Sequence, residues 1–425
     1  MKILFAPKEF VFSTVAADLA VVLYDHADTP GRGSVGAAVR QDIAKSRLKP
    51  AARAWDLLSI AMAAVTADLA GHRNKSPDGW TREFDLTIAV IDPEFWNAQA
   101  DLIARLLSYL TTDRWLIRFI GGGHMPKPPQ VPVEPSEECV TLLSGGLDSL
   151  IGAIDLTASG KKILAVSELV RGDAEKQRDF AALIGGGITH LQLHHNATVP
   201  HPEVPPSQRA RSVAFLAYGV LAATTLGRYH AGHRVALTIC ENGFIAINPA
   251  LTGSRVGSLS TRTTHPVVLA LFQKILSNAG LRVDVSNPYR FKTKGEMLAE
   301  CADQALIQQV AHRSTSCGRF LRFGYIHCGR CVPCLVRRAA FRRWGRIDQT
   351  PYKFSDLSKR DGDHADFDDV RAVAMAILER KEVGLRRWLG VSLSSDLIAD
   401  RTDLTEVVGR GLDELRVLLT DFKIL

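Results

Sequence analysis

No run of apolar residues in the sequence is long enough to cross a lipid bilayer. A membrane-spanning helix needs about 20 consecutive apolar residues, and no stretch of this 425-residue chain reaches that length. The opening residues, MKILFAPKEFVF, contain only a few apolar positions before a charge, and no small-residue cleavage site follows them. We therefore expect a cytoplasmic protein with no membrane partner.

The even set of cysteines that is typical of a disulfide-bonded secreted protein is also absent. There are seven cysteines, and four of them lie in the stretch CGRFLRFGYIHCGRCVPC. An odd total with such crowding favours a metal site over disulfides. Two overlapping Cys-x-x-Cys steps and a fourth cysteine upstream can close a tetrahedral zinc site with no open position for water, so the zinc would be structural. The ligands would be Cys317, Cys328, Cys331 and Cys334; an iron–sulfur cluster is the alternative occupant.

A strong overall charge is lacking too, because 52 Lys and Arg stand against 45 Asp and Glu. The excess is local: residues 281–350 contain 13 Lys and Arg against 5 Asp and Glu. If the protein binds a nucleic acid, this segment is where we expect the contact. The alternative is that these cations offset the negative charge of the thiolates, so nucleic acid is not the partner that we favour.

The length predicts several globular domains, each able to bury its own core. Residues 1–125 contain strand-like stretches and helical patterns, which predict an α/β or α+β accessory domain. A Gly- and Pro-rich stretch at 126–138 reads as a linker. Residues 139–346 form the predicted central domain with the cysteine turn, and residues 347–425 a helical C-terminal extension.

The central domain alternates apolar strands with helices. Strand-like runs begin near residues 140, 163, 189, 234 and 281, and helical patterns separate them. This alternation predicts a five-stranded parallel sheet covered by helices on both faces. Ligands of such sheets bind at the carboxyl ends of the strands, beside the point where the strand order reverses.

The stretch TLLSGGLDSL lies at one such strand end, directly before a predicted helix. Two glycines let the backbone approach a ligand closely, and the hydroxyls and free N–H groups at a helix start favour an anion, above all phosphate. The loop lacks the Lys and the spacing of a Walker A motif. The candidate anion-binding residues are Ser144, Gly145, Gly146, Asp148 and Ser149; the alternative is an exposed turn in which Asp148 caps the helix.

Ser-Gly-Gly-Leu-Asp-Ser resembles the PP-loop of the ATP pyrophosphatase group, whose sheet is of the adenine-nucleotide alpha hydrolase-like (HUP) type. The resemblance implies that these five residues bind the pyrophosphate part of ATP, accompanied by Mg²⁺, while a substrate attacks the α-phosphate. Adenylation with release of pyrophosphate needs no covalent nucleophile from the protein.

Together with the cysteine turn, the loop resembles the 7-cyano-7-deazaguanine synthase (QueC) family over roughly residues 141–341. Two further stretches, ARS and FKTKGEML, are similar to motifs of that family. The resemblance implies that Arg211 lies near the nucleotide phosphates, that Arg211 and Lys294 take part in catalysis beside Glu296, and that zinc is structural. The implied reaction is adenylation of a 7-deazaguanine carboxylate, displacement of AMP by ammonia to give the amide, and a second activation of the amide that yields the nitrile.

The chain also departs from that family. A Tyr-Pro-Asp-Cys stretch of the synthases is missing, and Ser212 stands where they have Asn. The corresponding region offers Asn242, Arg262, Thr263, Thr264 and His265 as candidate substrate contacts; ordinary loop hydrogen bonding is the alternative for each.

The additional domains and a Ser-Thr-Arg-Thr-Thr-His-Pro stretch resemble the QueC-like proteins of the Qat anti-phage defence system. That resemblance implies a ligase that joins a 7-deazaguanine to an amine of a partner protein from the same defence operon. Two other functions stay open. A tRNA-modifying PP-loop enzyme would use the basic segment and Cys240 as a reactive thiol. A non-catalytic nucleotide-binding subunit of a defence complex is the other.

Overall fold

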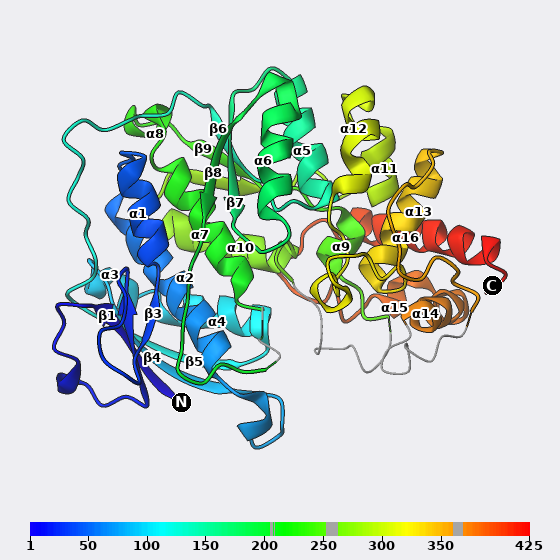
Figure 1. The fold of residues 1–425 in the computed structure, drawn as a ribbon. Coiled ribbons are helices and arrows are strands. Elements are labelled where there is room, and N and C mark those ends of the chain that lie inside the picture. Colours follow the sequence, from blue (N-terminus) through cyan, green and yellow to red (C-terminus); the bar gives the residue numbers. More distant parts are fainter. Residues whose placement is uncertain (205–206, 208, 252–261, 360–368) are drawn as a thin grey trace.

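Two parallel five-stranded sheets form the body of the protein (Figure 1). The computed structural model describes residues 1–425 except 205–206, 208, 252–261 and 360–368. The strand order is β3-β2-β1-β4-β5 in the first sheet and β10-β9-β6-β7-β8 in the second. The predicted α/β class is confirmed, and of the two options for the N-terminal region the structure has the α/β one, because its strands pair in parallel.

The first sheet is built by the N-terminal residues. Its strands are β1 (Lys2–Pro7), β2 (Leu19–Leu23), β3 (Gly33–Val35), β4 (Glu83–Ala89) and β5 (Arg114–Ile120), and its helices are α1 (Ala37–Lys45), α2 (Ala52–Ala70), α3 (Pro93–Asn97) and α4 (Ala100–Thr111). The sequence pattern predicts one helix from Phe95 to Leu110, whereas the structure has two. Asp92 caps α3 through the Phe95 N–H with Pro93 in its first turn, and that short helix ends before α4 begins.

The second sheet follows the predicted alternation within a few residues. Its strands are β6 (Cys139–Leu142), β7 (Ile163–Glu168), β8 (Thr189–Leu193), β9 (Val235–Thr238) and β10 (Val283–Ser286). The helices between them are α5 (Leu147–Ala158), α6 (Ala174–Leu183), α7 (Arg211–Ala223), α8 (Gly227–His230), α9 (Gly243–Ile247) and α10 (Pro266–Asn278). Helices α5 and α6 contact β6, β7 and β8, whereas α7 and α10 contact β6, β7, β9 and β10. The strand order reverses beside β6, so the carboxyl end of β6 is the switch point where a ligand is expected.

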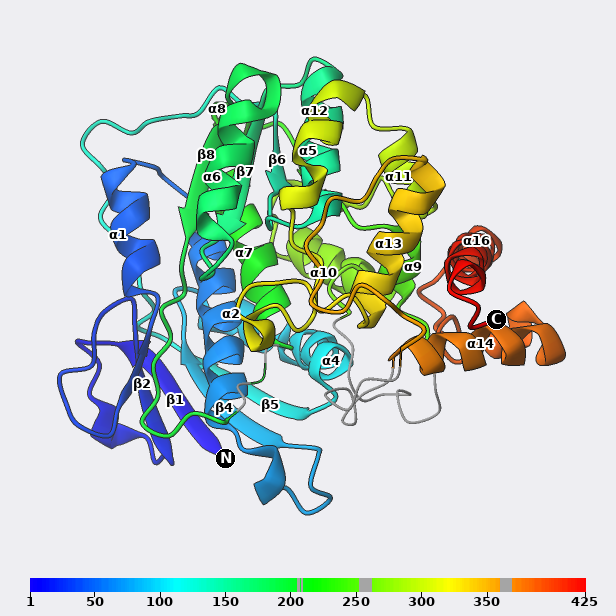
Figure 2. The same cartoon turned by 45° about the vertical axis from the view of Figure 1, so that its right-hand side comes forward.

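Helix α2 joins the two sheets. It is buried almost all round because it packs on the first sheet and also against α7 of the second (Figure 2). Side chains of both sheets therefore share one hydrophobic core. Residues 121–138 contain no helix or strand, and the domain boundaries that the sequence places there stay a prediction.

The C-terminal part is helical where it is described. Its helices are α11 (Lys294–Ala299), α12 (Gln304–Val310), α13 (Val332–Trp344), α14 (Asp369–Val383), α15 (Leu385–Trp388) and α16 (Arg401–Asp421). Single 3-10 turns occur at Phe12–Thr14, Arg73–Lys75, Ile184–Gly186, Ala311–Arg313 and Leu321–Phe323. Helix α16 packs on α13 and α9 (Figure 1). Within the described ranges, none of the helices combines the length and the apolar character needed to cross a membrane.

We predict that Gly152→Ala destabilises the protein, although Ala is the better helix former by about 1 kcal/mol. A Cβ atom on Gly152, in the middle of α5, would lie 2.1 Å from Cys240 Sγ. Relieving this overlap in a packed core costs about 1–3 kcal/mol. Urea unfolding measures the effect, with Gly121→Ala as the control because no atom lies within 4 Å of its Cβ position. Equal stability of the Gly152 variant and the wild type would contradict the packing.

Candidate functional site

The loop between β6 and α5 is held in a closed ring of hydrogen bonds. Gly145 has φ +86°, a conformation that favours glycine. The Ser144 N–H donates to Ser149 Oγ at 3.1 Å, and the two serine hydroxyls lie 3.0 Å apart. The Gly146 N–H donates to Ser144 Oγ at 3.2 Å. The structure thus brings four of the five predicted anion-binding residues together at the start of α5, where N–H groups and the helix dipole favour an anion.

Three residues outside the sequence motif support this loop. The Thr315 N–H donates to the Gly145 carbonyl at 2.9 Å, and the Gln177 side-chain amide donates to the Ser144 carbonyl at 3.2 Å. Lys176 donates to the Thr315 hydroxyl at 2.8 Å. Sequence patterns gave no signal for Gln177 or Thr315, because each reaches the loop from a distant segment. The loop therefore depends on α6 and on the segment that leads into the cysteine turn.

Asp148 is a buried ion-pair partner rather than an exposed cap. Its side chain is 6% exposed, and it pairs with the Lys294 ammonium, which is 7% exposed. Its second oxygen accepts from the backbone N–H and side-chain amide of Asn242, at 3.1 and 2.7 Å. Burial alone would raise the pKa of Asp148, but the Lys294 ammonium and these hydrogen bonds hold the pKa below its usual value. The burial of Asp148 and its pairing with Lys294 therefore exclude the alternative of an exposed turn in which Asp148 only caps the helix.

Glu241 adds a second carboxyl group that the sequence did not single out. It lies between the end of β9 and Asn242, and it is half-buried. Burial raises its pKa well above the usual value, and the neighbouring Asp148 carboxylate raises it further. The pKa values of the two acids are therefore shifted in opposite directions: that of Asp148 is lowered beside Lys294, whereas that of Glu241 is raised.

Arg211 lies at the same edge of the sheet as the loop. It is the first residue of α7, and its Nε atom is 2.5 Å from Glu168 Oε2 at the end of β7. The Gln177 amide that supports Ser144 also donates to the Glu168 carbonyl, at 3.1 Å. Burial raises the pKa of Glu168 and the Arg211 charge opposes this rise. The predicted nucleotide-binding arginine thus shares a supporting residue with the predicted phosphate loop.

His195 approaches Glu168 from the other side. Its Nε2 atom lies 3.5 Å from Glu168 Oε1, and its Nδ1 atom accepts from the Ala197 N–H at 3.0 Å. Burial lowers the pKa of His195 to about 4, with further contributions from His194 and Arg211. A neutral ring whose Nδ1 accepts carries its proton on Nε2, so the His195 N–H faces the Glu168 carboxylate.

The five predicted substrate contacts fall into two groups. Asn242 belongs to the Asp148 pair, and its side-chain oxygen also caps α9 through the Ile245 N–H. The segment 262–265 lies instead beside α7 and α4: the Thr263 hydroxyl donates to Ser212 Oγ at 2.8 Å, and the Arg262 guanidinium lies over the Tyr109 ring at 4.9 Å. The role of both groups in substrate binding stays a prediction.

His265 and Thr264 are buried within this second group. His265 Nδ1 caps α10 through the Val267 N–H, and its ring contacts the Tyr109 hydroxyl and the Ser392 carbonyl. Burial lowers the pKa of His265 to about 4. This ring joins the N-terminal, central and C-terminal parts. Ser260 and Thr261, which precede it in the quoted motif, lie outside the described residues.

The four cysteines form a compact buried group. Their sulfur atoms all lie within 4.8 Å of one another, with the Cys328–Cys334 and Cys317–Cys331 pairs at 3.9 and 3.8 Å. Four sulfurs at 2.3 Å from a tetrahedral zinc ion lie about 3.8 Å apart, so the group fits a single zinc ion. In an iron–sulfur cluster the thiolates bind different iron atoms and stand further apart, so the distances favour zinc.

The backbone supports thiolates at these positions. The N–H groups of Arg319 and Cys328 each donate to Cys317 Sγ at 3.3 Å, and that of Cys331 donates to Cys328 Sγ at the same distance. Such donors orient metal ligands and offset their charge. Thr315 lies two residues before Cys317, so the segment that bonds Gly145 leads directly into the cysteine turn.

The cations of the basic segment 281–350 are mostly used within the protein. Six of them face acidic side chains: Arg290–Asp400, Lys292–Glu300, Lys294–Asp148, Arg313–Asp179, Arg342–Asp421 and Arg343–Glu414. Arg337 is buried and donates to Thr350 and Ser314. This pairing leaves less free positive charge for a nucleic acid than the sequence count indicates.

Cys240 is not placed as a reactive thiol. It is buried beneath α5 against Gly152. Burial raises the pKa of its thiol well above the usual value, so the nucleophilic thiolate is disfavoured. The proposed role of Cys240 in tRNA modification loses its physical support.

We predict one zinc ion per chain and its loss in Cys331→Ser. Because the metal holds a loop-rich segment, its removal should lower the free energy of unfolding by several kcal/mol, out of an apparent binding energy on the order of 10 kcal/mol. Elemental analysis and thermal unfolding measure both effects, and iron in place of zinc would be detected directly. Cys301→Ser is the control, since this buried cysteine lies outside the group. Full zinc content in Cys331→Ser would contradict the assignment.

We predict that Glu241→Gln reduces the loss of stability as pH rises above about 4.5, the ordinary Glu pKa. A carboxyl group whose folded pKa is raised keeps its proton while the unfolded chain releases it, so the wild type loses stability as pH rises through this window. Gln mimics the protonated acid and removes that contribution. Urea unfolding between pH 5 and 8 measures the difference. Glu414, with its pKa raised to about 7, contributes equally to both proteins; identical slopes would refute the raised pKa of Glu241.

Comparison with known proteins gives distant relatives of one kind. No family model matches the chain. Among curated proteins, the 7-cyano-7-deazaguanine synthase of Methanocaldococcus jannaschii is 25% identical over 238 residues, which are 51% of this chain and 99% of that protein. The synthases of Rhizobium etli and Sphingopyxis alaskensis are 27% and 26% identical, covering 52% and 50% of this chain and 94% and 97% of their own lengths. About half of the chain is therefore distantly similar to these synthases, and the other half has no counterpart in them.

Proposed function

We propose that the protein is an ATP-dependent ligase that adenylates a 7-deazaguanine carboxylate or a related group and joins it to an amine of a partner protein in anti-phage defence. The observation that carries the proposal is the meeting of the 144–149 loop with Arg211 and the Asp148–Lys294 pair at the switch point of a QueC-like chain. These residues offer hydrogen-bond donors and two cations to a triphosphate.

In the proposed reaction, the loop and the start of α5 bind the β- and γ-phosphates of ATP, which arrives with Mg²⁺. A carboxylate oxygen of the substrate forms a bond to the α-phosphorus, and the bond to the bridging oxygen breaks, so pyrophosphate leaves with the electron pair. An amine nitrogen then attacks the acyl carbon, AMP leaves, and the nitrogen loses a proton. Arg211 and Lys294 stabilise the charge on the phosphates during the first step.

The parts of the chain that have no counterpart in the synthases support a partner protein as the acceptor. The N-terminal sheet and helices α14 to α16 lie outside residues 141–341, the region that resembles the synthases, and the matched synthases are about half as long as this chain. The burial of Cys240 and the pairing of the basic segment favour this function over tRNA modification. Attack by ammonia, as an amide-forming step on the free small molecule, is the nearest alternative acceptor chemistry.

Mass spectrometry of co-purifying proteins tests the proposal. In cells that make 7-deazaguanines, we expect a partner carrying a deazaguanine-sized adduct at an amine with the wild type and none with Ser149→Ala, because the variant loses a hydroxyl of the loop. Ser159→Ala at the far end of α5 is the matched control and should retain the adduct.

If the partner carries no adduct with either the wild type or Ser149→Ala, and pyrophosphate is released only when ammonia is supplied, the acceptor is a small molecule rather than a partner protein. Nucleotide binding without any release of pyrophosphate would indicate a non-catalytic subunit and contradict the proposal.

A further inference from the structure

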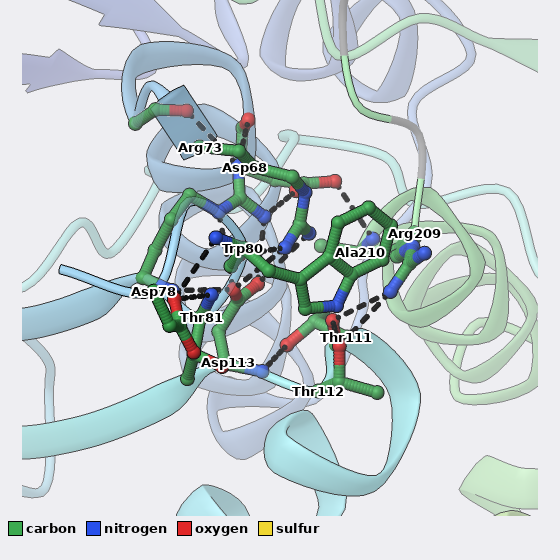
Figure 3. Close-up of polar contacts among 12 residues, drawn as sticks. Asp68, Arg73, Asp78, Trp80, Thr81, Thr111, Thr112, Asp113, Arg209 and Ala210 are labelled. Atoms are coloured by element: carbon green, nitrogen blue, oxygen red, sulfur yellow. Dashed lines mark hydrogen bonds and ion pairs between the residues drawn. The ribbon is translucent and has the colours of Figure 1, made fainter. Parts of the chain in front are cut away.

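The N-terminal sheet has no part in the proposed chemistry, yet a cluster of charges links it to the start of α7 (Figure 3). We call this the arginine–aspartate cluster. It consists of Asp68, Arg73, Arg82, Asp113, Glu203 and Arg209, with Trp80 packed among them. Three cations face three carboxylates at the junction of the two sheets, so the cluster carries no formal net charge.

Arg82 holds the cluster together. Its side chain is 3% exposed, and its Nη2 atom lies 2.5 Å from Asp68 Oδ1 and 2.6 Å from Asp113 Oδ2. Its Nη1 atom donates to the backbone carbonyls of Asp68 and Gly71. These bonds fix the Asp68 carboxylate at the end of α2 in one orientation. Buried ion pairs of this kind often stabilise no more than well-packed apolar residues would, but they can impose one geometry.

Asp68 uses its other oxygen on α7. The Ala210 N–H donates to Asp68 Oδ2 at 3.0 Å, and Ala210 directly precedes Arg211, the first residue of α7. N–H groups at a helix start have no partner within the helix, so a buried acceptor there sets the position of the first turn. An acidic partner also suits the positive end of the helix dipole.

Arg209 provides a second attachment on the same side. It donates to the Thr111 carbonyl and the Thr112 hydroxyl at 3.1 and 3.0 Å, and its guanidinium lies 4.8 Å from the centre of the Trp80 ring (Figure 3). Burial lowers the pKa of Arg209 to about 10, and the Arg73 charge contributes. The residue before Ala210 is thus tied to the first sheet as well.

The first sheet also holds the other end of the connection that precedes α7. The Gly36 N–H donates to the His195 carbonyl at 2.7 Å, and Ser34 exchanges backbone hydrogen bonds with Thr198 at 3.0 and 2.8 Å. His195 and Arg211 both face Glu168. The N-terminal sheet therefore holds the chain next to both residues that flank this carboxylate.

We infer that Asp68 is a positioning residue for Arg211, and that the N-terminal sheet is a required part of the nucleotide site rather than only a surface for partners. The inference rests on the proposed role of Arg211 in binding ATP. Asp68 does not touch the ligand; it acts by fixing the first turn of α7 from which Arg211 projects.

Asp68→Asn tests the inference because an amide has a similar shape but only one acceptor oxygen. Arg82 and Ala210 bond different oxygens of Asp68, so the amide of the variant can keep only one of these two hydrogen bonds. We expect the dissociation constant for ATP to rise about tenfold, a coupling typical of residues in one network, and the increase to vanish in an Arg211→Ala background. Arg118→Ala is the control: its exposed ion pair with Asp85 lies in the same sheet and does not contact α7.

An equal loss of ATP affinity in both backgrounds would overturn the inference, because a merely structural role does not depend on Arg211. Hydrogen exchange at residues 210–214 gives a readout that needs no nucleotide, and we expect faster exchange in Asp68→Asn. Arg209→Gln is the second variant if Asp68→Asn does not fold, with the same expectation. If wild-type protein binds no ATP, the proposed function fails, whereas unchanged exchange in both variants refutes the positioning role alone.

Discussion

The buried ion pair between Asp148 and Lys294 joins segments that are 146 residues apart in the chain. Separating two charges from water is costly unless both are paired and hydrogen-bonded, so α5, α11 and the Asn242 turn must meet in one arrangement. That arrangement places the start of α5 at the switch point of the second sheet. In the proposed reaction an arriving triphosphate meets this preformed site.

Two other parts of the chain, one N-terminal and one C-terminal to the loop in sequence, also support this site. On one side, the segment that leads into the cysteine turn bonds Gly145 through Thr315. Helix α11 begins with a capping box in which Glu296 bonds Thr293, and Glu296 also pairs with Arg410. On the other, the N-terminal sheet reaches α7 through Asp68. Glu296, which the family resemblance places beside Lys294, thus anchors α11 to α16 in this structure. The N-terminal sheet and α16 thus contact the segment 141–341 that resembles the synthases.

Periodicity and local chemistry were sufficient for the second sheet and the cysteine group. Apolar runs separated by helical patterns fix five parallel strands, and four cysteines in eighteen residues fix a metal site. Glu168, His195 and Asp68 gave no comparable signal, because their importance comes from partners 43, 27 and 142 residues away, which no local pattern specifies. Asn242 illustrates the limit: its type suggested a ligand contact, but its amide groups bond Asp148 and the start of α9.

A crystal structure with a non-hydrolysable ATP analogue would show directly whether residues 144–149 bind the triphosphate. We expect the β- and γ-phosphates within hydrogen-bonding distance of the Ser144 and Ser149 hydroxyls and the Gly146 N–H, with Arg211 and Lys294 directed toward the triphosphate. A triphosphate bound elsewhere on the chain, with the hydrogen bonds among residues 144–149 and the Asp148–Lys294 pair unchanged, would contradict it.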